Sequence, residues 1–194
     1  MQNSNTNIPE QQAKGKLLAL FFLGSGLLVL GIAALLVLPK TALPDSAADG
    51  SVVPLAVKFT APEVSLNDLE GQPASLAAYL GKVVLVNNWA TWCPPCKAEM
   101  PALQAFYEAH KNQNFELIGI EAGEPASEVS LFVKQYRLTF PIWLDPDSKS
   151  LDAFHNQALP NSYVIDKNGV VRLAWSGAIS RDMLEKYIVP LLEE

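Results

Sequence analysis

Cys93 and Cys96 are the only cysteines in this chain of 194 residues, and they lie in the sequence WCPPC at 92–96. The mostly apolar residues 82–89 predict a buried strand before them, whereas the residues from Lys97 onward favour a helix. The N-terminus of a helix offers unpaired N–H groups and the positive end of the helix dipole, and both stabilise a thiolate. This arrangement favours thiol–disulfide exchange.

The two cysteines have distinct expected roles. Cys93 is the candidate nucleophile, and we expect it to be presented at the surface with Trp92 packing over it. Cys96 lies one helical turn later on the same face, so it can close a disulfide with Cys93 and resolve a mixed disulfide. Pro94 and Pro95 lack a backbone N–H, which removes two donors near the Cys93 sulfur. Weaker stabilisation of the thiolate predicts a low reduction potential, and hence a reductase rather than an oxidant.

Other uses of two cysteines fit the chain less well. A structural zinc site takes about four Cys or His ligands, and the chain adds only His110 and His155, far apart in sequence. Covalent haem attachment requires a histidine after the second cysteine, where Lys97 stands. A purely structural disulfide would close too short a loop to constrain the unfolded chain much. We therefore expect no metal and no bound cofactor.

Residues 17–38 form an uninterrupted run without a charge. A helix of this length spans about 33 Å, which is enough to cross a hydrocarbon core of roughly 30 Å. The run is longer than the apolar part of a signal peptide, and no small-residue cleavage site follows it, so we predict a permanent signal-anchor. Lys14 and Lys16 precede the run, and the positive-inside rule then places residues 1–16 in the cytoplasm and the remainder outside.

Residues 39–56 are rich in Pro, Ala, Ser and Asp and predict a linker, and residues 57–194 have the size of one domain. The net charge is −6 without a basic cluster, so binding to nucleic acid has no electrostatic support. Strand and helix patterns alternate in this domain and predict an α/β sandwich with a mixed sheet. The expected strands are 59–66 and 72–76, joined as a hairpin, then 83–89, 115–121, 142–144, 161–166 and 170–175. The expected helices are 94–111, 127–136, 148–154 and 182–192.

The order strand, W-C-x-x-C, helix, and then a proline before a β-hairpin resembles the thioredoxin fold. Residues 58–101, KFTAPEVSLNDLEGQPASLAAYLGKVVLVNNWATWCPPCKAEMP, resemble the membrane-anchored ResA/TlpA/DsbE family of thiol–disulfide oxidoreductases, within the AhpC/TSA-redoxin-like group. The resemblance extends to the C-terminus. It implies a single-pass protein of the cytoplasmic membrane whose catalytic domain reduces protein disulfides on the periplasmic side.

The resemblance also implies partners. The implied process is cytochrome c-type biogenesis, in which the enzyme would keep the C-x-x-C-H thiols of apocytochrome c reduced for haem attachment. Electrons would come from a membrane donor of the CcdA/DsbD type.

A substrate-binding edge is implied at Leu159-Pro160. By the resemblance, Pro160 is cis and lies beside the cysteines, so that the backbone of Leu159 can pair with a substrate segment. Trp92, Pro94 and Pro95 complete the expected substrate-binding residues. Here the sequence NS follows the proline, whereas the family often has two threonines.

Glu124 is the acid that the resemblance places near the cysteines. It follows the predicted strand 115–121, and a partly buried carboxylate there would have a raised pKa and could move the Cys96 proton. Asn87 stands where thioredoxin has a buried aspartate, so Glu124 is the acid candidate from motif matching. We assign Glu99 only a surface or core role on its helix.

Two alternatives remain. A peroxiredoxin-type peroxidase would carry P-x-x-x-T-x-x-C, but counting back from Cys96 places Trp89 at the proline position and Cys93 at the threonine position. A redox-silent binding or chaperone module would use the groove near Pro160 without cysteine chemistry.

Overall fold

The computed structural model describes residues 51–194. The predicted cytoplasmic segment 1–16, the predicted membrane span 17–38 and most of the predicted linker lie outside these residues. Within residues 51–194, no helix is both long and apolar enough to cross a membrane.

The central strand, Val83–Trp89 (β4), is buried at every residue. It pairs in parallel with Phe115–Glu121 (β5) and antiparallel with Asn161–Ile165 (β7). A strand covered on both faces needs apolar side chains on both, which explains its nearly continuous apolar sequence. The prediction of strands at 83–89 and 115–121 is confirmed.

Eight strands form one mixed sheet in the order β1-β8-β7-β4-β5-β6-β2-β3. β4, β5 and β6 run parallel, and every other neighbouring pair is antiparallel. The remaining strands are Leu55–Thr60 (β1), Ser65–Asp68 (β2), Pro73–Ser75 (β3), Ile142–Leu144 (β6) and Val170–Ser176 (β8). The helices are the 3₁₀ turn Leu76–Tyr79 (η1), Pro94–His110 (α2), Ala126–Tyr136 (α3), Lys149–Ala153 (α4) and Arg181–Leu192 (α5).

The start of the domain differs from the prediction in two ways. The expected hairpin strand 59–66 is wrong in its first part, because residues 59–60 end β1, which pairs with β8 at the sheet edge. Pro62 follows β1 and cannot donate to a strand ladder, so the chain breaks there and the hairpin proper is β2–β3. In addition, β1 begins at Leu55, inside the segment expected to be linker.

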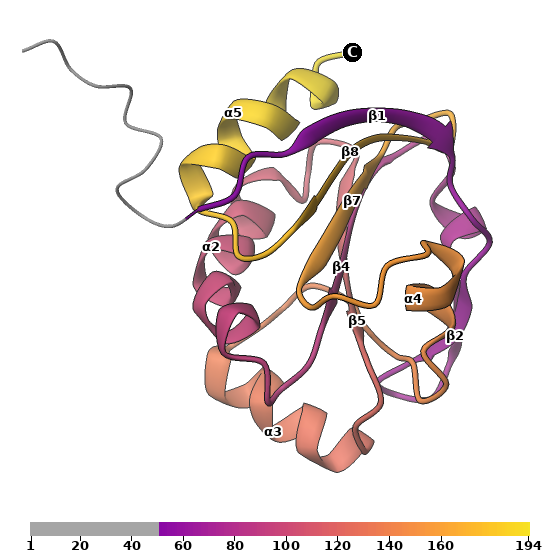
Figure 1. The fold of residues 1–194 in the computed structure, drawn as a ribbon, viewed down its shortest axis with the longest axis vertical. Coiled ribbons are helices and arrows are strands. Elements are labelled where there is room, and N and C mark those ends of the chain that lie inside the picture. Colours follow the sequence, from indigo (N-terminus) through magenta and orange to yellow (C-terminus); the bar gives the residue numbers. More distant parts are fainter. Residues whose placement is uncertain (1–50) are drawn as a thin grey trace, which may run out of the picture. The chain divides into compact units, whose positions relative to one another are not determined.

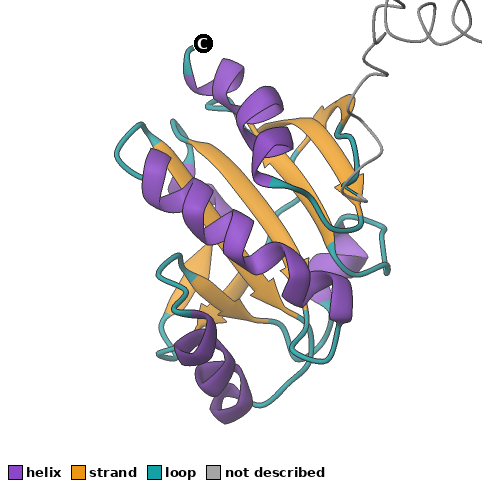
Figure 2. Cartoon of the chain, turned by 90° about the vertical axis from the view of Figure 1, so that its left-hand side faces the viewer, coloured by secondary structure: helices purple, strands orange, loops and turns teal. Residues whose placement is uncertain are grey.

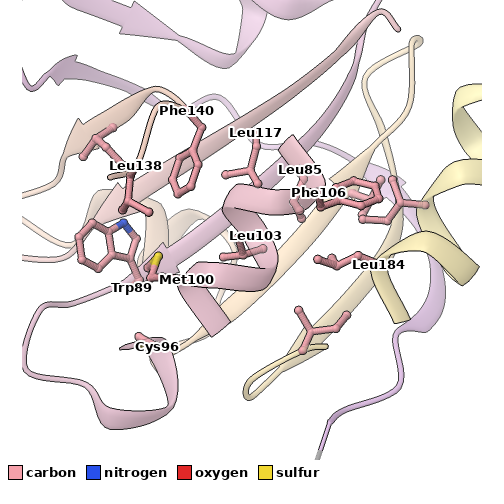
Figure 3. Packing of buried hydrophobic residues seen from close by; sticks show 14 of the residues in the cluster. Leu85, Trp89, Cys96, Met100, Leu103, Phe106, Leu117, Leu138, Phe140 and Leu184 are labelled. Carbon is pink, nitrogen blue, oxygen red and sulfur yellow. The ribbon is translucent and has the colours of Figure 1, made fainter. Parts of the chain in front are cut away.

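Helices cover both faces of the sheet (Figure 1). Side chains of α2, α3 and α5 pack against one face, and Figure 2, turned toward that side, shows helices in front of the strands. η1 and α4 contribute to the smaller cluster on the other face. Figure 3 shows the larger core: Leu85 and Leu117 from the sheet meet Leu103 and Phe106 from α2, and all four are fully buried. α2 is therefore fixed against the sheet directly behind its N-terminus.

Candidate active site

The strand register brings three chain segments together at one edge of the sheet. Asn88 of β4 lies opposite Asn161 of β7, and Trp89 of β4 lies opposite Glu121 of β5. The turn that follows β4 and carries the cysteines therefore starts next to two segments: the end of β5 and the residues just before β7.

Cys93 is the N-cap residue of α2 and forms a disulfide with Cys96, with a Cα–Cα distance of 5.3 Å. Pro94 and Pro95 occupy the first two helical positions and have no N–H to offer the sulfur. The Cys96 N–H donates to Cys93 Sγ at 3.3 Å. The sulfur of Cys93 thus receives one backbone hydrogen bond from the first turn of α2.

Cys93 is only 3% exposed and Cys96 is fully buried, so the expectation that Cys93 is presented at the surface is wrong for the disulfide form. The disulfide directs the Cys93 sulfur toward Cys96, which lies on the inward side of α2 (Figure 3). Trp92 is 63% exposed, and both prolines are exposed beside it. Access to the cysteines is therefore bordered by exposed apolar groups.

The Leu159–Pro160 peptide bond is cis, as the resemblance implied. Pro160 is buried directly before β7, and the half-buried side chain of Leu159 packs against the cluster that contains both cysteines. Within residues 51–194, neither the N–H nor the C=O of Leu159 has a hydrogen-bond partner. The segment thus offers an unpaired donor and acceptor near the disulfide.

Glu124 lies at the site but does not have the predicted pKa. Its carboxylate accepts hydrogen bonds from the Thr91 N–H, at 2.6 Å, and from the Thr91 hydroxyl. Burial acts to raise the pKa of Glu124, but the hydrogen bonds from Thr91 and Glu121 and the charge of Lys97 outweigh it, and the pKa is lowered. The expected raised pKa is therefore wrong. Glu124 is a charged anchor for the turn two residues before Cys93.

Glu121, at the end of β5, is the neighbouring acid that sequence reasoning missed. It is fully buried, and one of its carboxyl oxygens accepts from the Glu124 N–H at 3.0 Å. Burial raises the pKa of Glu121 to about 8, and the side-chain hydrogen bond with the Glu124 carboxylate and the charges of Glu124 and Asp145 add to this effect, whereas the hydrogen bond from the Glu124 N–H acts to lower the pKa. At neutral pH Glu121 is protonated beside the charged Glu124.

Glu99 is the second missed acid. It lies on the buried side of α2, one helical turn after Cys96, and is 1% exposed. Its two carboxyl oxygens accept from Asn87 Nδ2 at 2.8 Å and from the Ile179 N–H at 3.2 Å. Burial raises the pKa of Glu99 to about 8 despite these two hydrogen bonds, which act to lower it.

A signal for Glu99 was present in the sequence. Buried side chains of α2 recur at Cys96, Met100 and Leu103, and Glu99 interrupts this apolar stripe on the same side. A carboxyl in such a stripe is either neutral or paired. Its partner Asn87 occupies the place where thioredoxin has its acid, so the carboxyl is supplied from the helix rather than from the strand.

Comparison with known proteins is consistent with this geometry. The AhpC/TSA family model matches residues 57–174. The thiol-disulfide oxidoreductase ResA of Geobacillus kaustophilus is 38% identical over 134 residues, which cover 69% of this chain and 77% of that protein.

Two solved structures share the fold. One is a Chlorobium tepidum protein assigned as the thiol:disulfide interchange protein DsbE, with a TM-score of 0.66 and 26% identity, covering 71% of this chain and 99% of that one. The other is StoA from Bacillus subtilis, with a TM-score of 0.56 and 26% identity, covering 69% of this chain and 98% of that one.

The raised pKa of Glu99 predicts a pH-dependent stability. The pKa of Glu99 is 4.5 in the unfolded chain and about 8 in the folded protein. Between pH 4.5 and 8 the folded protein therefore binds the proton more tightly than the unfolded chain does. The contribution of Glu99 to the free energy of unfolding therefore falls as pH rises from 4.5 to about 8. Gln does not titrate, so the free energy of unfolding of Glu99→Gln should increase relative to that of wild type as pH rises through this window. Urea titration of the two oxidised proteins at several pH values measures the difference.

Glu121→Gln should show the same sign, since the pKa of Glu121 is also raised to about 8. The exposed Glu70 provides the control, because Glu70→Gln removes a carboxyl that is not buried. A difference between Glu99→Gln and wild type that stays constant from pH 4.5 to 8 would contradict the proposed protonation of Glu99.

The anchoring role of Glu124 gives a second prediction. Glu124→Ala removes both hydrogen bonds to Thr91 and should lower the free energy of unfolding by about 3–6 kcal/mol, since each hydrogen bond to a charged group contributes roughly 1.5–3 kcal/mol. Thr91→Val removes the hydroxyl but keeps the N–H, so it should cost about half as much. Equal losses in the two variants would show that the backbone hydrogen bond contributes nothing.

Proposed function

This chain belongs to the AhpC/TSA family and is a thiol–disulfide oxidoreductase of the ResA and DsbE type, and on that premise we propose that it works as a disulfide reductase on protein substrates. Its Cys93–Cys96 pair accepts electrons from a donor and passes them to a disulfide in another protein.

The direction of electron flow is supported by the start of α2. The side chain of an N-cap residue usually accepts from the N–H of the second or third helical residue. Here Pro95 is the second residue and has no N–H, so only Cys96 donates to Cys93 Sγ. A less stabilised thiolate makes the reduced form less favoured, which lowers the reduction potential and makes the pair a better electron donor.

The first chemical step is attack on the substrate. The Cys93 thiolate attacks one sulfur of the substrate disulfide, a bond forms between Cys93 and that sulfur, and the substrate S–S bond breaks. The other substrate sulfur leaves as a thiolate and takes up a proton. The border of exposed Trp92, Pro94 and Pro95 provides an apolar surface for the substrate around this reaction.

The second step regenerates the disulfide. Cys96 must lose its proton before it attacks the Cys93 sulfur, and Glu99 lies one turn away on the buried side of α2. With a pKa of about 8, a fraction of Glu99 is ionised near neutral pH and can accept this proton. Attack forms the Cys93–Cys96 bond and releases the second substrate thiolate. The substrate gains two electrons, and the enzyme is left oxidised.

We place this reaction outside the cytoplasm and assign it to cytochrome c maturation. The uncharged run 17–38 supports a membrane anchor, and Lys14 and Lys16 support a cytoplasmic N-terminus. Apocytochrome c would be the client, through its C-x-x-C-H disulfide. A membrane dithiol donor of the CcdA/DsbD type would reduce the Cys93–Cys96 disulfide after each cycle, because an oxidising compartment supplies no reductant.

The reductase assignment predicts the potential of the cysteine pair. We expect a reduction potential closer to that of thioredoxin, about −270 mV, than to that of DsbA, about −120 mV. Pro95→Ala restores an N–H at the second helical position and should raise the reduction potential. The rise is about 30 mV for each tenfold gain in the equilibrium constant for reduction of the Cys93–Cys96 disulfide. Pro94→Ala is the matched control, because the first helical N–H does not point at the cap side chain.

Equilibration of the purified residues 51–194 with glutathione or dithiothreitol buffers, followed by alkylation and mass spectrometry, measures these potentials. A wild-type reduction potential near −120 mV would contradict the reductase assignment. Equal potentials for the two alanine variants would remove the missing Pro95 N–H as its cause.

Client trapping tests the cytochrome assignment separately. Cys96→Ser leaves Cys93 free to attack but removes the resolving thiol, so mixed disulfides with clients should accumulate in cells. The double variant Cys93→Ser, Cys96→Ser is the control and should trap nothing. We expect apocytochromes with C-x-x-C-H among the trapped proteins. Clients that all lack this sequence would remove the cytochrome assignment and leave the reductase assignment standing.

A further inference from the structure

The loop after β5 brings two carboxyl groups together beside the turn that carries the cysteines. Glu121 ends β5, and Gly123, with a φ of +98°, turns the chain so that Glu124 folds back toward Glu121. The Glu124 N–H donates to Glu121 Oε2 at 3.0 Å, and the two carboxyl groups also share a side-chain hydrogen bond. Two carboxylates have no donor between them, so this contact requires one proton.

Glu121 is the group that holds this proton. It is fully buried, and its Oε1 receives no hydrogen bond from any donor within residues 51–194. The charges that act on it, from Glu124 and Asp145, are both negative. Ionised Glu121 would thus be a poorly paired buried anion beside two others, and its pKa is accordingly raised to about 8. Glu124 is partly exposed and near Lys97, so it carries the charge.

The charged Glu124 in turn holds the turn that leads to Cys93. Residues 90–93 are closed by a hydrogen bond from the Cys93 N–H to the Ala90 carbonyl at 3.3 Å. Thr91 lies inside this turn, and both its N–H and its hydroxyl donate to the Glu124 carboxylate. The position of the nucleophile therefore depends on a carboxylate that is itself oriented by its neighbouring acid.

We propose that Glu121 is a positioning residue whose proton holds the Glu124 carboxylate on Thr91. Loss of that proton to solvent then releases the turn and slows the attack of Cys93 on a substrate disulfide. The inference rests on the proposed function and deepens it, because it adds regulation by pH to the same site. When Glu121 ionises, its O–H donor is lost and two like charges face each other. Glu124 is the more exposed of the two, so it moves toward solvent and Thr91 loses its acceptor.

The pH dependence of the reaction tests this inference. Glu121→Gln keeps the size and the neutral charge of the protonated acid, and its amide can donate to Glu124 at every pH. The rate constant of the reduced full-length protein with oxidised insulin is measured from about pH 6 to about pH 9.5. Wild type and variant should agree within about twofold up to about pH 7. At about pH 9 only about one-tenth of Glu121 remains protonated, so wild type should be about tenfold slower than the variant.

The comparison at each pH cancels effects that both proteins share, such as the ionisation of Cys93 or Glu99. Glu128→Gln is the matched control, because it removes an exposed carboxyl from the first turn of α3. Its rate relative to wild type should not change with pH. A ratio of Glu121→Gln to wild type that stays constant across the whole range would overturn the inference, since a merely structural role gives no such pH dependence.

A titration of the unchanged protein decides the question if Glu121→Gln does not fold. In NMR spectra of the oxidised full-length protein, the Thr91 amide signal should shift with a midpoint near pH 8, together with the carboxyl carbon of Glu121. A Thr91 signal that stays constant from about pH 6 to about pH 9.5 would overturn the inference. If wild type reduces no insulin at neutral pH, the proposed function fails, whereas the Thr91 titration alone decides whether Glu121 controls the turn.

Discussion

Two consecutive buried asparagines at the end of β4 hold the two sides of the site. Asn87 faces α2 and donates to Glu99 and to the Ser162 hydroxyl. Asn88 faces the opposite side of the sheet and donates to Asn161, while it accepts from Ser150. Because successive side chains of a strand point to opposite faces, one short stretch of backbone fixes both the buried acid behind the cysteines and the segment before the cis proline. Movement of this strand end would disturb both at once.

The sequence predicted the elements better than it predicted their contacts. Residues 83–89 and 115–121 are short, mostly apolar runs, and such a run indicates a buried strand without any knowledge of its neighbours. The hydrogen bonds of Glu99 join residues 12 and 80 positions away, and no local pattern encodes such pairings. β1 was placed wrongly for the same reason, since its partner β8 lies at the other end of the domain. The cysteines, Pro160 and Glu124 could be located because they belong to a motif or follow one.

Three carboxyl groups near the cysteines differ in charge because their surroundings differ. Glu99 and Glu121 are buried away from cations, and burial holds their protons up to a pKa of about 8. Glu124 is partly exposed and receives two hydrogen bonds from Thr91, so it stays ionised. The site therefore keeps exchangeable protons in its interior and a fixed negative charge at its rim. This division suits a reaction in which a buried thiol must lose a proton while the substrate binds from outside.

The atom that caps α2 is also the atom that reacts. When Cys93 Sγ changes between disulfide, mixed disulfide and thiolate, the acceptor for the Cys96 N–H changes with it. The folding free energy of the helix and the redox equilibrium of the pair are consequently linked, as any two equilibria that share one group must be. A substitution far along α2, with no contact to sulfur, changes the reduction potential of the cysteine pair whenever it stabilises the helix more in one oxidation state than in the other. Evolution can thus tune electron transfer from the packing face of a helix and leave the reactive motif untouched.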